Sequence, residues 1–350
     1  MDMRRVRFFH LWVGLALLAW GYGASPQSKD AAATQNISAL KREAASGDAK
    51  AQIKLSAAYY LGRDVSQDYA QAAYWSRKAA EQGNAIAQYN LGIFYQNGRG
   101  VPQDYAMAAA WWSKAAEQGN ANAQFKLGWS YEFGMGVPQD YARSITLYRR
   151  AADQGLAVAQ FVLGVGYSNG VGVPQDASQA AMWFRKAAEQ GDSDAQNALA
   201  DAYGSGKGVP KDFTQMVAWY RKAAGQGNAN AQKSLGNSYF FGDGVERDQV
   251  ESARWYRRAA ENGNADAQFD LGVMYYEGTG VAQDYTESYF WLDIAAAGNP
   301  IGDNLEVADV GKVAKRRDDA ASHLTRTVLL QTQERARKWL EDHPAKASQQ

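Results

Sequence analysis

The sequence predicts an all-α fold, an α/α solenoid of seven 36-residue helix-loop-helix repeats with terminal capping helices. Three observations lead to this prediction. The phrase Gly-Asn-Ala-Ile-Ala-Gln at 83–88 returns, with small changes, every 36 residues along most of the chain. Each period holds two apolar stripes with helical spacing, separated by glycine-rich breaks. Only seven prolines occur among 350 residues, which favours helices.

Residues 83–118 illustrate one repeat. Ala87, Leu91 and Tyr95 lie at positions i, i+4 and i+8, so they share one face of a first helix. A glycine-rich loop ends that helix, and a second apolar stripe follows. Gly119 ends the second stripe, where a left-handed backbone costs a glycine little. Each repeat is therefore predicted to contain helix A, a glycine loop, helix B and a glycine stop.

Helix A contains a leucine followed in most repeats by a glycine, as in Leu91-Gly92. A glycine inside a helix costs about 1 kcal/mol relative to alanine, so we expect helix B to approach closely at this point. Helix B carries a large side chain at one position of every repeat, which we expect to be buried. These residues are Trp75, Trp111, Leu147, Trp183, Trp219, Trp255 and Trp291.

An aspartate precedes helix B in every repeat: Asp68, Asp104, Asp140, Asp176, Asp212, Asp248 and Asp284. Aligned carboxylates raise the possibility of a ladder of metal sites. A simpler interpretation is a helix N-cap, in which the carboxylate accepts a backbone N–H for about 1 kcal/mol per helix. We expect the caps and predict neither a metal nor a cofactor, because calcium-binding repeats need a denser pattern of glycine and aspartate.

The repeat resembles the Sel-one-like repeat (SLR) family, which is similar to tetratricopeptide repeats with a longer loop between the helices. The matching string is Ala-x-x-Leu-Gly-x-x-Tyr, then Gly-x-Gly-Val, Asp-Tyr-x-x-Ala and Trp-x-x-Lys-Ala-Ala, over about 47–297. Departures are few, such as Asp64 where the second repeat has Gly100. The resemblance implies a right-handed solenoid whose A helices line a concave groove.

The segments outside the array suggest export and capping. Arginines followed by an apolar run and small residues predict a signal peptide at 1–23, with an uncleaved membrane anchor as the alternative. A disordered linker at 24–36 and an N-terminal capping helix at 37–46 are expected to follow. After the array at 47–297 we expect C-terminal capping helices at 298–343, in which the charged run 315–319 is a solvated face, and a tail at 344–350. The predicted location is periplasmic or secreted.

Composition and motifs give little support for catalysis. Lys+Arg and Asp+Glu both total 37, so the chain lacks the basic excess that nucleic-acid binding needs. The absence of cysteine excludes thiolate chemistry and cysteine zinc sites. A G-x-S-x-G match around Ser168 falls at the end of a predicted helix A, without the preceding strand that a nucleophile elbow requires. No catalytic residue is predicted, and the protein is not expected to be an enzyme.

Variable positions on helix A are the candidates for partner binding, because constant positions build the scaffold. Relative to the Leu-Gly-x-x-Tyr core, the predicted groove residues are Ile86, Tyr89, Ile93, Phe125, Trp129, Glu132, Phe161, Asp201 and Phe240. Packing between successive repeats is an equal alternative for Tyr89, Phe125 and Phe161. Trp129 is favoured as an anchor, because other repeats carry alanine, aspartate or asparagine at its position.

These observations predict an exported scaffold or adaptor that holds a partner protein or peptide in the groove and regulates an envelope or host protein. Two alternatives remain: a hydrolase that acts on the cell wall, and a structural spacer that assembles with itself. Neither a nucleic-acid partner nor a membrane span after leader cleavage is expected.

Overall fold

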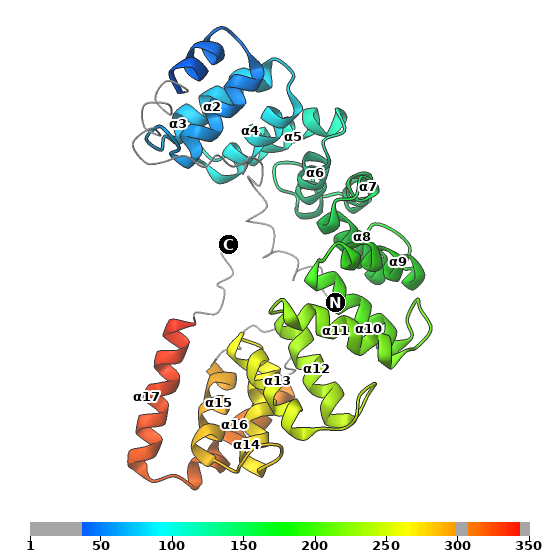
Figure 1. Ribbon diagram of the computed structural model, residues 1–350, viewed down its shortest axis with the longest axis vertical. Coiled ribbons are helices and arrows are strands. Elements are labelled where there is room, and N and C mark those ends of the chain that lie inside the picture. The colour runs from blue at the N-terminus through cyan, green and yellow to red at the C-terminus, as the bar shows by residue number, and fades with distance from the viewer. Residues whose placement is uncertain (1–36, 298–306, 344–350) are drawn as a thin grey trace, which may run out of the picture. The chain divides into compact units, whose positions relative to one another are not determined.

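We analysed the chain as a computed structural model, which describes residues 37–297 and 307–343 (Figure 1). These residues form α-helices joined by turns and short loops, and they contain no β-strand. The chain divides into two compact units, Met1–Asp176 and Ala177–Gln350. The predicted leader and linker (1–36), the start of the C-terminal cap (298–306) and the tail (344–350) lie outside the described residues.

The described part of the first unit contains a helical segment at 37–45, followed by α2 (Ala49–Leu61), α3 (Tyr69–Glu81), α4 (Ala85–Asn97), α5 (Tyr105–Glu117), α6 (Ala121–Phe133), α7 (Tyr141–Asp153) and α8 (Ala157–Asn169). The second unit contains α9 (Ala177–Glu189), α10 (Ser193–Ser205), α11 (Phe213–Gly225), α12 (Ala229–Phe241), α13 (Gln249–Glu261), α14 (Ala265–Glu277), α15 (Tyr285–Ala297), α16 (Val307–Ser322) and α17 (Arg326–Asp342). Even-numbered helices from α2 to α14 are helix A of a repeat, and odd-numbered helices from α3 to α15 are helix B. Consecutive helices of the array pack together within each unit, which confirms the predicted all-α repeat architecture.

The helix ends follow the sequence signals. Asp104 is the N-cap of α5, and its carboxylate accepts the backbone N–H of Met107 at 2.9 Å. Equivalent bonds cap α3, α7, α11, α13 and α15 at Asp68, Asp140, Asp212, Asp248 and Asp284. Helix A ends at a left-handed glycine, such as Gly98 with a φ of 64°. The N-cap interpretation of these aspartates is confirmed.

Helix A and helix B approach closely at the glycine inside helix A, as predicted. A Cβ atom at Gly92 would lie 2.3 Å from Nε1 of Trp112, and one at Gly128 would lie 2.9 Å from the Tyr148 ring. The residue that faces the glycine is therefore one position later than the large residue singled out from the sequence. Trp112 is completely buried, whereas Trp111 is partly exposed, because a one-residue step turns a side chain by about 100° around the helix.

The indole one position earlier instead packs beneath a cation on the next turn of helix B. The Nζ atom of Lys114 lies 4.2 Å from the centre of the Trp111 ring. The same pairs recur as Trp183–Lys186, Trp219–Lys222 and Trp255–Arg258, at 4.0, 3.7 and 4.6 Å. In α7 the corresponding residues are Leu147 and Arg150, so the indole is missing there.

A buried glutamine in each helix A connects successive helices. Nε2 of Gln88 donates to the carbonyl of Ala80 at the end of α3, at 3.2 Å, and its Oε1 accepts from Gln118 of α5 at 2.7 Å. The same two bonds recur at Gln52, Gln124, Gln196 and Gln232. The last carbonyls of a helix lack partners within it, and this glutamine supplies one.

An arginine–tyrosine ladder joins each helix B to helix A of the next repeat. Arg77 of α3 donates to the hydroxyl of Tyr95 on α4 at 2.6 Å. The ladder continues with Arg149–Tyr167 in the first unit and with Arg185–Tyr203, Arg221–Tyr239 and Arg257–Tyr275 in the second. Ser113 of α5 takes the place of this arginine and interrupts the ladder.

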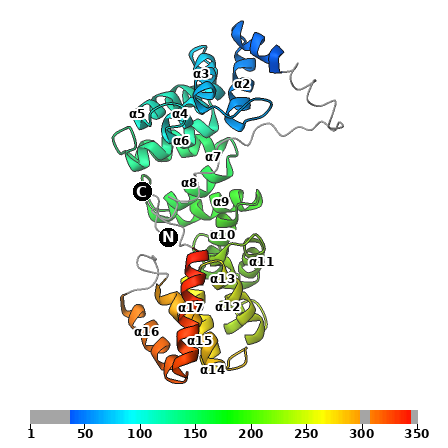
Figure 2. The same ribbon diagram turned by 90° about the vertical axis from the view of Figure 1, so that its left-hand side faces the viewer.

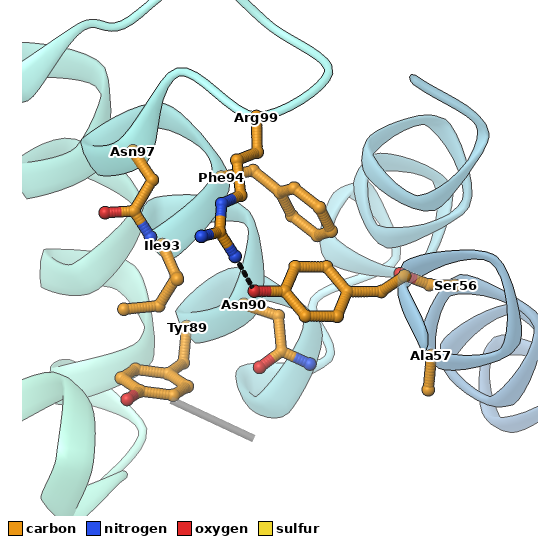
Figure 3. A pocket seen from close by; sticks show the side chains of 9 residues that line it. Ser56, Ala57, Tyr89, Asn90, Ile93, Phe94, Asn97 and Arg99 are labelled. Atoms are coloured by element: carbon orange, nitrogen blue, oxygen red, sulfur yellow. Dashed lines mark hydrogen bonds between the residues drawn. The ribbon is translucent and has the colours of Figure 1, made fainter. Parts of the chain in front are cut away.

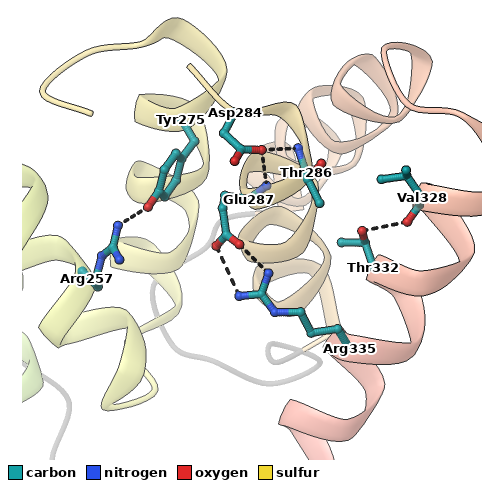
Figure 4. Close-up of polar contacts among 8 residues, drawn as sticks. All are labelled: Arg257, Tyr275, Asp284, Thr286, Glu287, Val328, Thr332 and Arg335. Atoms are coloured by element: carbon teal, nitrogen blue, oxygen red, sulfur yellow. Dashed lines mark hydrogen bonds and ion pairs between the residues drawn. The ribbon is translucent and has the colours of Figure 1, made fainter. Parts of the chain in front are cut away.

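Two helices close the second unit, and both pack against α15 (Figure 2). Arg335 of α17 forms an ion pair with Glu287 of α15 (Figure 4), and its guanidinium lies 3.8 Å from the centre of the Phe290 ring. Trp339 meets Trp291 edge-on, with ring centres 6.1 Å apart. α17 thus covers the aromatic side chains of the last helix B.

Candidate protein-binding surface

Part of the predicted groove lies at the surface. Ile86, at the start of α4, is 45% exposed. Ile93, Trp129 and Phe240 are half-buried, and Asp201 is exposed. These residues belong to α4 and α6 of the first unit and to α10 and α12 of the second, which are all A helices.

The other predicted groove residues are buried and need correction as partner contacts. Tyr89, Phe125, Phe161 and Glu132 are 9%, 5%, 6% and 3% exposed, so the packing alternative describes the three aromatic residues. The Phe125 ring lies 5.3 Å from the Tyr148 ring. Burial also raises the pKa of Tyr89 to about 12. These side chains stabilise the repeats rather than offering free anchors.

Glu132 is buried and accepts a hydrogen bond from helix B. The Tyr148 hydroxyl donates to its Oε2 at 2.6 Å. Burial, together with the neighbouring carboxylate, raises the pKa of Tyr148 well above its usual value. A buried carboxylate is tolerated when it is hydrogen-bonded, so this pair has a structural role.

Tyrosines of two further B helices have acceptors on helix A in the second unit. The Tyr220 hydroxyl donates to Oδ1 of Asp201, and the Tyr256 hydroxyl donates to Oδ1 of Asn237, both at 2.5 Å. Asp201 therefore has a structural partner, although the residue is exposed. In these two repeats, a polar residue at this position of helix A accepts a hydrogen bond from a tyrosine of helix B. The sequence analysis did not predict this pairing, although the two residues lie 19 positions apart in both repeats.

Trp129 occupies the same helix position but lies beside an aromatic ring and a cation. Its ring lies 5.5 Å from the Phe133 ring and 6.0 Å from Nζ of Lys126. The acceptor for the tyrosine opposite is instead Glu132, one turn further along α6. Trp129 thus lacks the polar role that Asp201 and Asn237 have at this position and remains a candidate contact.

A small pocket opens between the A helices α2 and α4 (Figure 3). Tyr89 and Ile93 line it together with Ala57, Asn90 and other residues of both helices. Arg99 reaches across its edge to the hydroxyl of Tyr60, whose ring it also covers at 5.6 Å. The pocket offers an apolar wall with amides at its rim, which suits an aliphatic side chain of a bound segment.

A second hollow lies between α12, α14 and α16 of the second unit. Phe240 lines it beside Phe241, which is 67% exposed and was missed by the sequence analysis. Lys315, Arg316 and Asp319 from the run expected to be a solvated face also line it, and Arg316 lies 3.7 Å from Glu277. The charged run therefore borders an apolar hollow.

The described residues offer no constellation that resembles a metal or nucleophilic site. Within 37–297 and 307–343, no group of three or more His, Cys, Asp or Glu side chains is arranged to hold a metal ion. Ser168 is the penultimate residue of α8, on a helix rather than on a strand-to-helix turn. The arrangement fits recognition of side chains, with apolar walls and charged rims.

Paired helices, aspartates that cap helix B, and side-chain hydrogen bonds that recur from repeat to repeat define a helical repeat scaffold. The Sel1 repeat family model matches seven consecutive segments: 49–84, 85–120, 121–156, 157–192, 193–228, 229–264 and 265–300. The chain therefore belongs to the Sel1 repeat family, whose repeats generally form scaffolds for protein interaction.

Solved structures give the same result. The chain is 35% identical to a Sel1 repeat protein from Oxalobacter formigenes, over 82% of this chain and 81% of that one, with a TM-score of 0.65. It is 29% identical to a protective antigen present in uropathogenic Escherichia coli strains, described as displaying an SLR fold, over 88% and 87% of the two chains, with a TM-score of 0.52. No curated protein matches the chain.

None of the helices in the described part of the chain is both long enough and apolar enough to cross a bilayer. The predicted leader lies outside the described residues.

Proposed function

We propose that this protein is an exported scaffold that binds a partner protein or peptide through the surface of its A helices. The proposed contacts are the accessible residues Ile86, Ile93, Trp129 and Phe240, together with the pocket between α2 and α4. Phe125, Phe161 and Glu132 are buried behind this surface, Tyr89 lines the pocket, and the exposed Asp201 would hold helix B in place through Tyr220.

One observation carries the proposal: helix A keeps its inner face from repeat to repeat and changes its outer face. The inner leucines such as Leu91 are fully buried. The position of Ile86 is instead occupied in later repeats by Asn122, Val158, Asp194, Asn230 and Asp266. A surface that varies in chemistry on a constant scaffold is typical of recognition by repeat proteins.

Export is supported by the arginine-led apolar segment at 1–23. The 29% identity to a protective antigen is in keeping with exposure outside the cytoplasm. Fractionation of cells and sequencing of the mature N-terminus test this part. A mature chain that begins near residue 24 in the periplasm or medium is expected, and an intact leader in the cytoplasm would contradict export.

Site-specific photo-crosslinking tests the binding surface. A photoreactive amino acid is placed in living cells at Ile86 or Trp129 on helix A, or at Met107 on helix B. Met107 is a matched control because it is 38% exposed. We expect both A-helix positions to capture the same protein, identified by mass spectrometry, and Met107 not to capture it. Capture from Met107 alone would place the interface on the B helices.

A further inference from the structure

Two exceptions to the repeat pattern occur at the same junction of the first unit. The ladder arginine of helix B is replaced by Ser113 in α5, and the indole of helix B is replaced by Leu147 in α7. At the preceding junction, between α3 and α5, Arg77 and Trp111 occupy the equivalent positions. Two large side chains are therefore absent from neighbouring helices, which leaves space between them.

Both exceptions line one pocket between α5, α6 and α7. Its volume is about 400 Å³, which is within the range of small ligand sites. Leu127, Leu147 and Ala116 contribute apolar surface, and Tyr131, Arg143 and Arg150 line it with polar groups. None of the residues proposed above for the A-helix surface lines this pocket, so it is a separate site.

Other repeats show which side chains occupy the equivalent space. In four of them an indole lies beneath the cation three residues later, at 3.7–4.6 Å from the ring centre. Arg150 holds that cation position in α7, but Leu147 gives it no ring to cover. A planar aromatic group in the pocket would meet the apolar surface of Leu127 and Leu147 and place its face toward Arg150.

Two kinds of ligand group could fill the pocket: an aromatic ring, or a guanidinium in place of the missing arginine. The charge of the pocket favours the aromatic ring. Two arginines, Arg143 and Arg150, line the pocket, against one carboxylate, Glu117. Glu117 accepts a hydrogen bond from Ser113 at 3.1 Å, and Arg143 already donates to the Tyr131 hydroxyl at 3.5 Å. A third guanidinium would add to the positive charge of these arginines, whereas an aromatic ring would not.

We propose that the pocket between α5, α6 and α7 is a binding site for an aromatic side chain, tryptophan above all, presented by a partner protein. The ring takes the place of the indole that Leu147 lacks. The site also uses the space that the ladder arginine leaves at Ser113.

A methyl NMR titration tests the proposal on the purified protein with labelled leucines. The probes are N-acetyltryptophanamide and, for comparison, N-acetylargininamide. We expect the first probe to cause saturable ring-current shifts at the methyl groups of Leu127 and Leu147. Absence of these shifts, or shifts with the arginine probe alone, would overturn the proposal.

Two double variants make the test independent of the wild-type signal. Ser113→Arg with Leu147→Trp restores the repeat pattern and should reduce the affinity for the tryptophan probe at least tenfold, read at Leu127, while the helical circular dichroism spectrum stays unchanged. Arg221→Ser with Trp255→Leu makes the same two changes between α11 and α13, and should produce new shifts at Leu235. Unchanged binding in the filled variant would show that the probe binds elsewhere.

Discussion

Lys126 is a cation held inside the first unit. Its side chain lies on α6 with 7% of the residue exposed, and burial lowers the pKa of its ammonium group from 10.5 to about 8. Between these values the unfolded chain binds more protons than the folded one. The free energy of unfolding therefore rises with pH across this window, and the full penalty of burying the charge applies below it.

Lys126→Met should remove this penalty. We expect the free energy of unfolding to increase by about 1–3 kcal/mol near pH 7, and the gain to shrink as the pH approaches about 10. Urea unfolding at both pH values measures the difference between variant and wild type. An equal gain at both pH values would mean that better packing, rather than removal of a buried charge, is responsible.

Gly92 allows Trp112 to enter the interface between α4 and α5. Gly92→Ala should lower the free energy of unfolding by about 1–3 kcal/mol, because the new methyl group has no space beside the indole. Gly225 is a matched control at the end of α11, since a Cβ atom there would meet nothing within 4 Å. Gly225→Ala should be neutral or stabilise by up to about 1 kcal/mol. If chemical denaturation shows equal effects, close approach does not explain Gly92.

Residues with a strict repeat pattern were predictable one by one. The core leucines, the glycine inside helix A and the capping aspartates each have a single physical role, and the structure shows those roles. Tyr89, Phe125 and Glu132 were harder to place. They lie at the edge of the helical apolar stripe, where exposure depends on the size of the side chain that the neighbouring helix presents.

At the level of helices, the buried glutamine is the connection that the sequence analysis overlooked. Gln88→Leu would remove one of the two hydrogen bonds at the carbonyl of Ala80, which also accepts from the Gly83 N–H, and would leave the Gln118 amide with only its long bond to Lys114. We expect the free energy of unfolding to fall by about 1–3 kcal/mol, as for other buried polar groups that lose a bond. Thermal unfolding measures this change. Gln71→Leu, on the exposed surface of α3, is the control and should have little effect.

The type and order of the helices followed from periodicity, glycine loops and caps, because these signals are local. The role of the glutamine did not, since its partners lie eight residues before it and thirty after it. A polar residue that recurs in every repeat is recognised from the sequence, but its hydrogen-bond partners are not. The same limit applies to the ladder arginine, whose tyrosine is 18 residues away.

In the whole molecule, the stability of each helix should depend mainly on the helices next to it in the chain. Helices of the array pack mainly on the helices before and after them, so a local loss should spread only a short way. Asp248→Ala removes the cap of α13 and should cost about 1 kcal/mol. Hydrogen exchange is expected to accelerate in α12 to α14 and to stay unchanged in α2 to α6. Acceleration along the entire chain would instead indicate one cooperative folding unit.

The number of repeats and the family were predictable over the array because the same glycine, leucine and aspartate positions recur every 36 residues. The pocket at Ser113 and Leu147 was not, although both exceptions are visible in the sequence. Their proximity depends on which faces of α5 and α7 meet at α6, and that is a property of stacked repeats rather than of any one repeat.

The glutamine bonds also bear on how such a chain changes in length over generations. In five repeats the glutamine joins the helix before it to the helix after it, with a glutamine amide as the second partner in four of them and Asn262 in the fifth. A genetic duplication or deletion of 36 residues, one family repeat, therefore creates a seam at which a glutamine, a carbonyl and a second amide meet again. Unequal recombination within the gene can lengthen or shorten the array without leaving a buried polar group unpaired, and so yields folded variants at once.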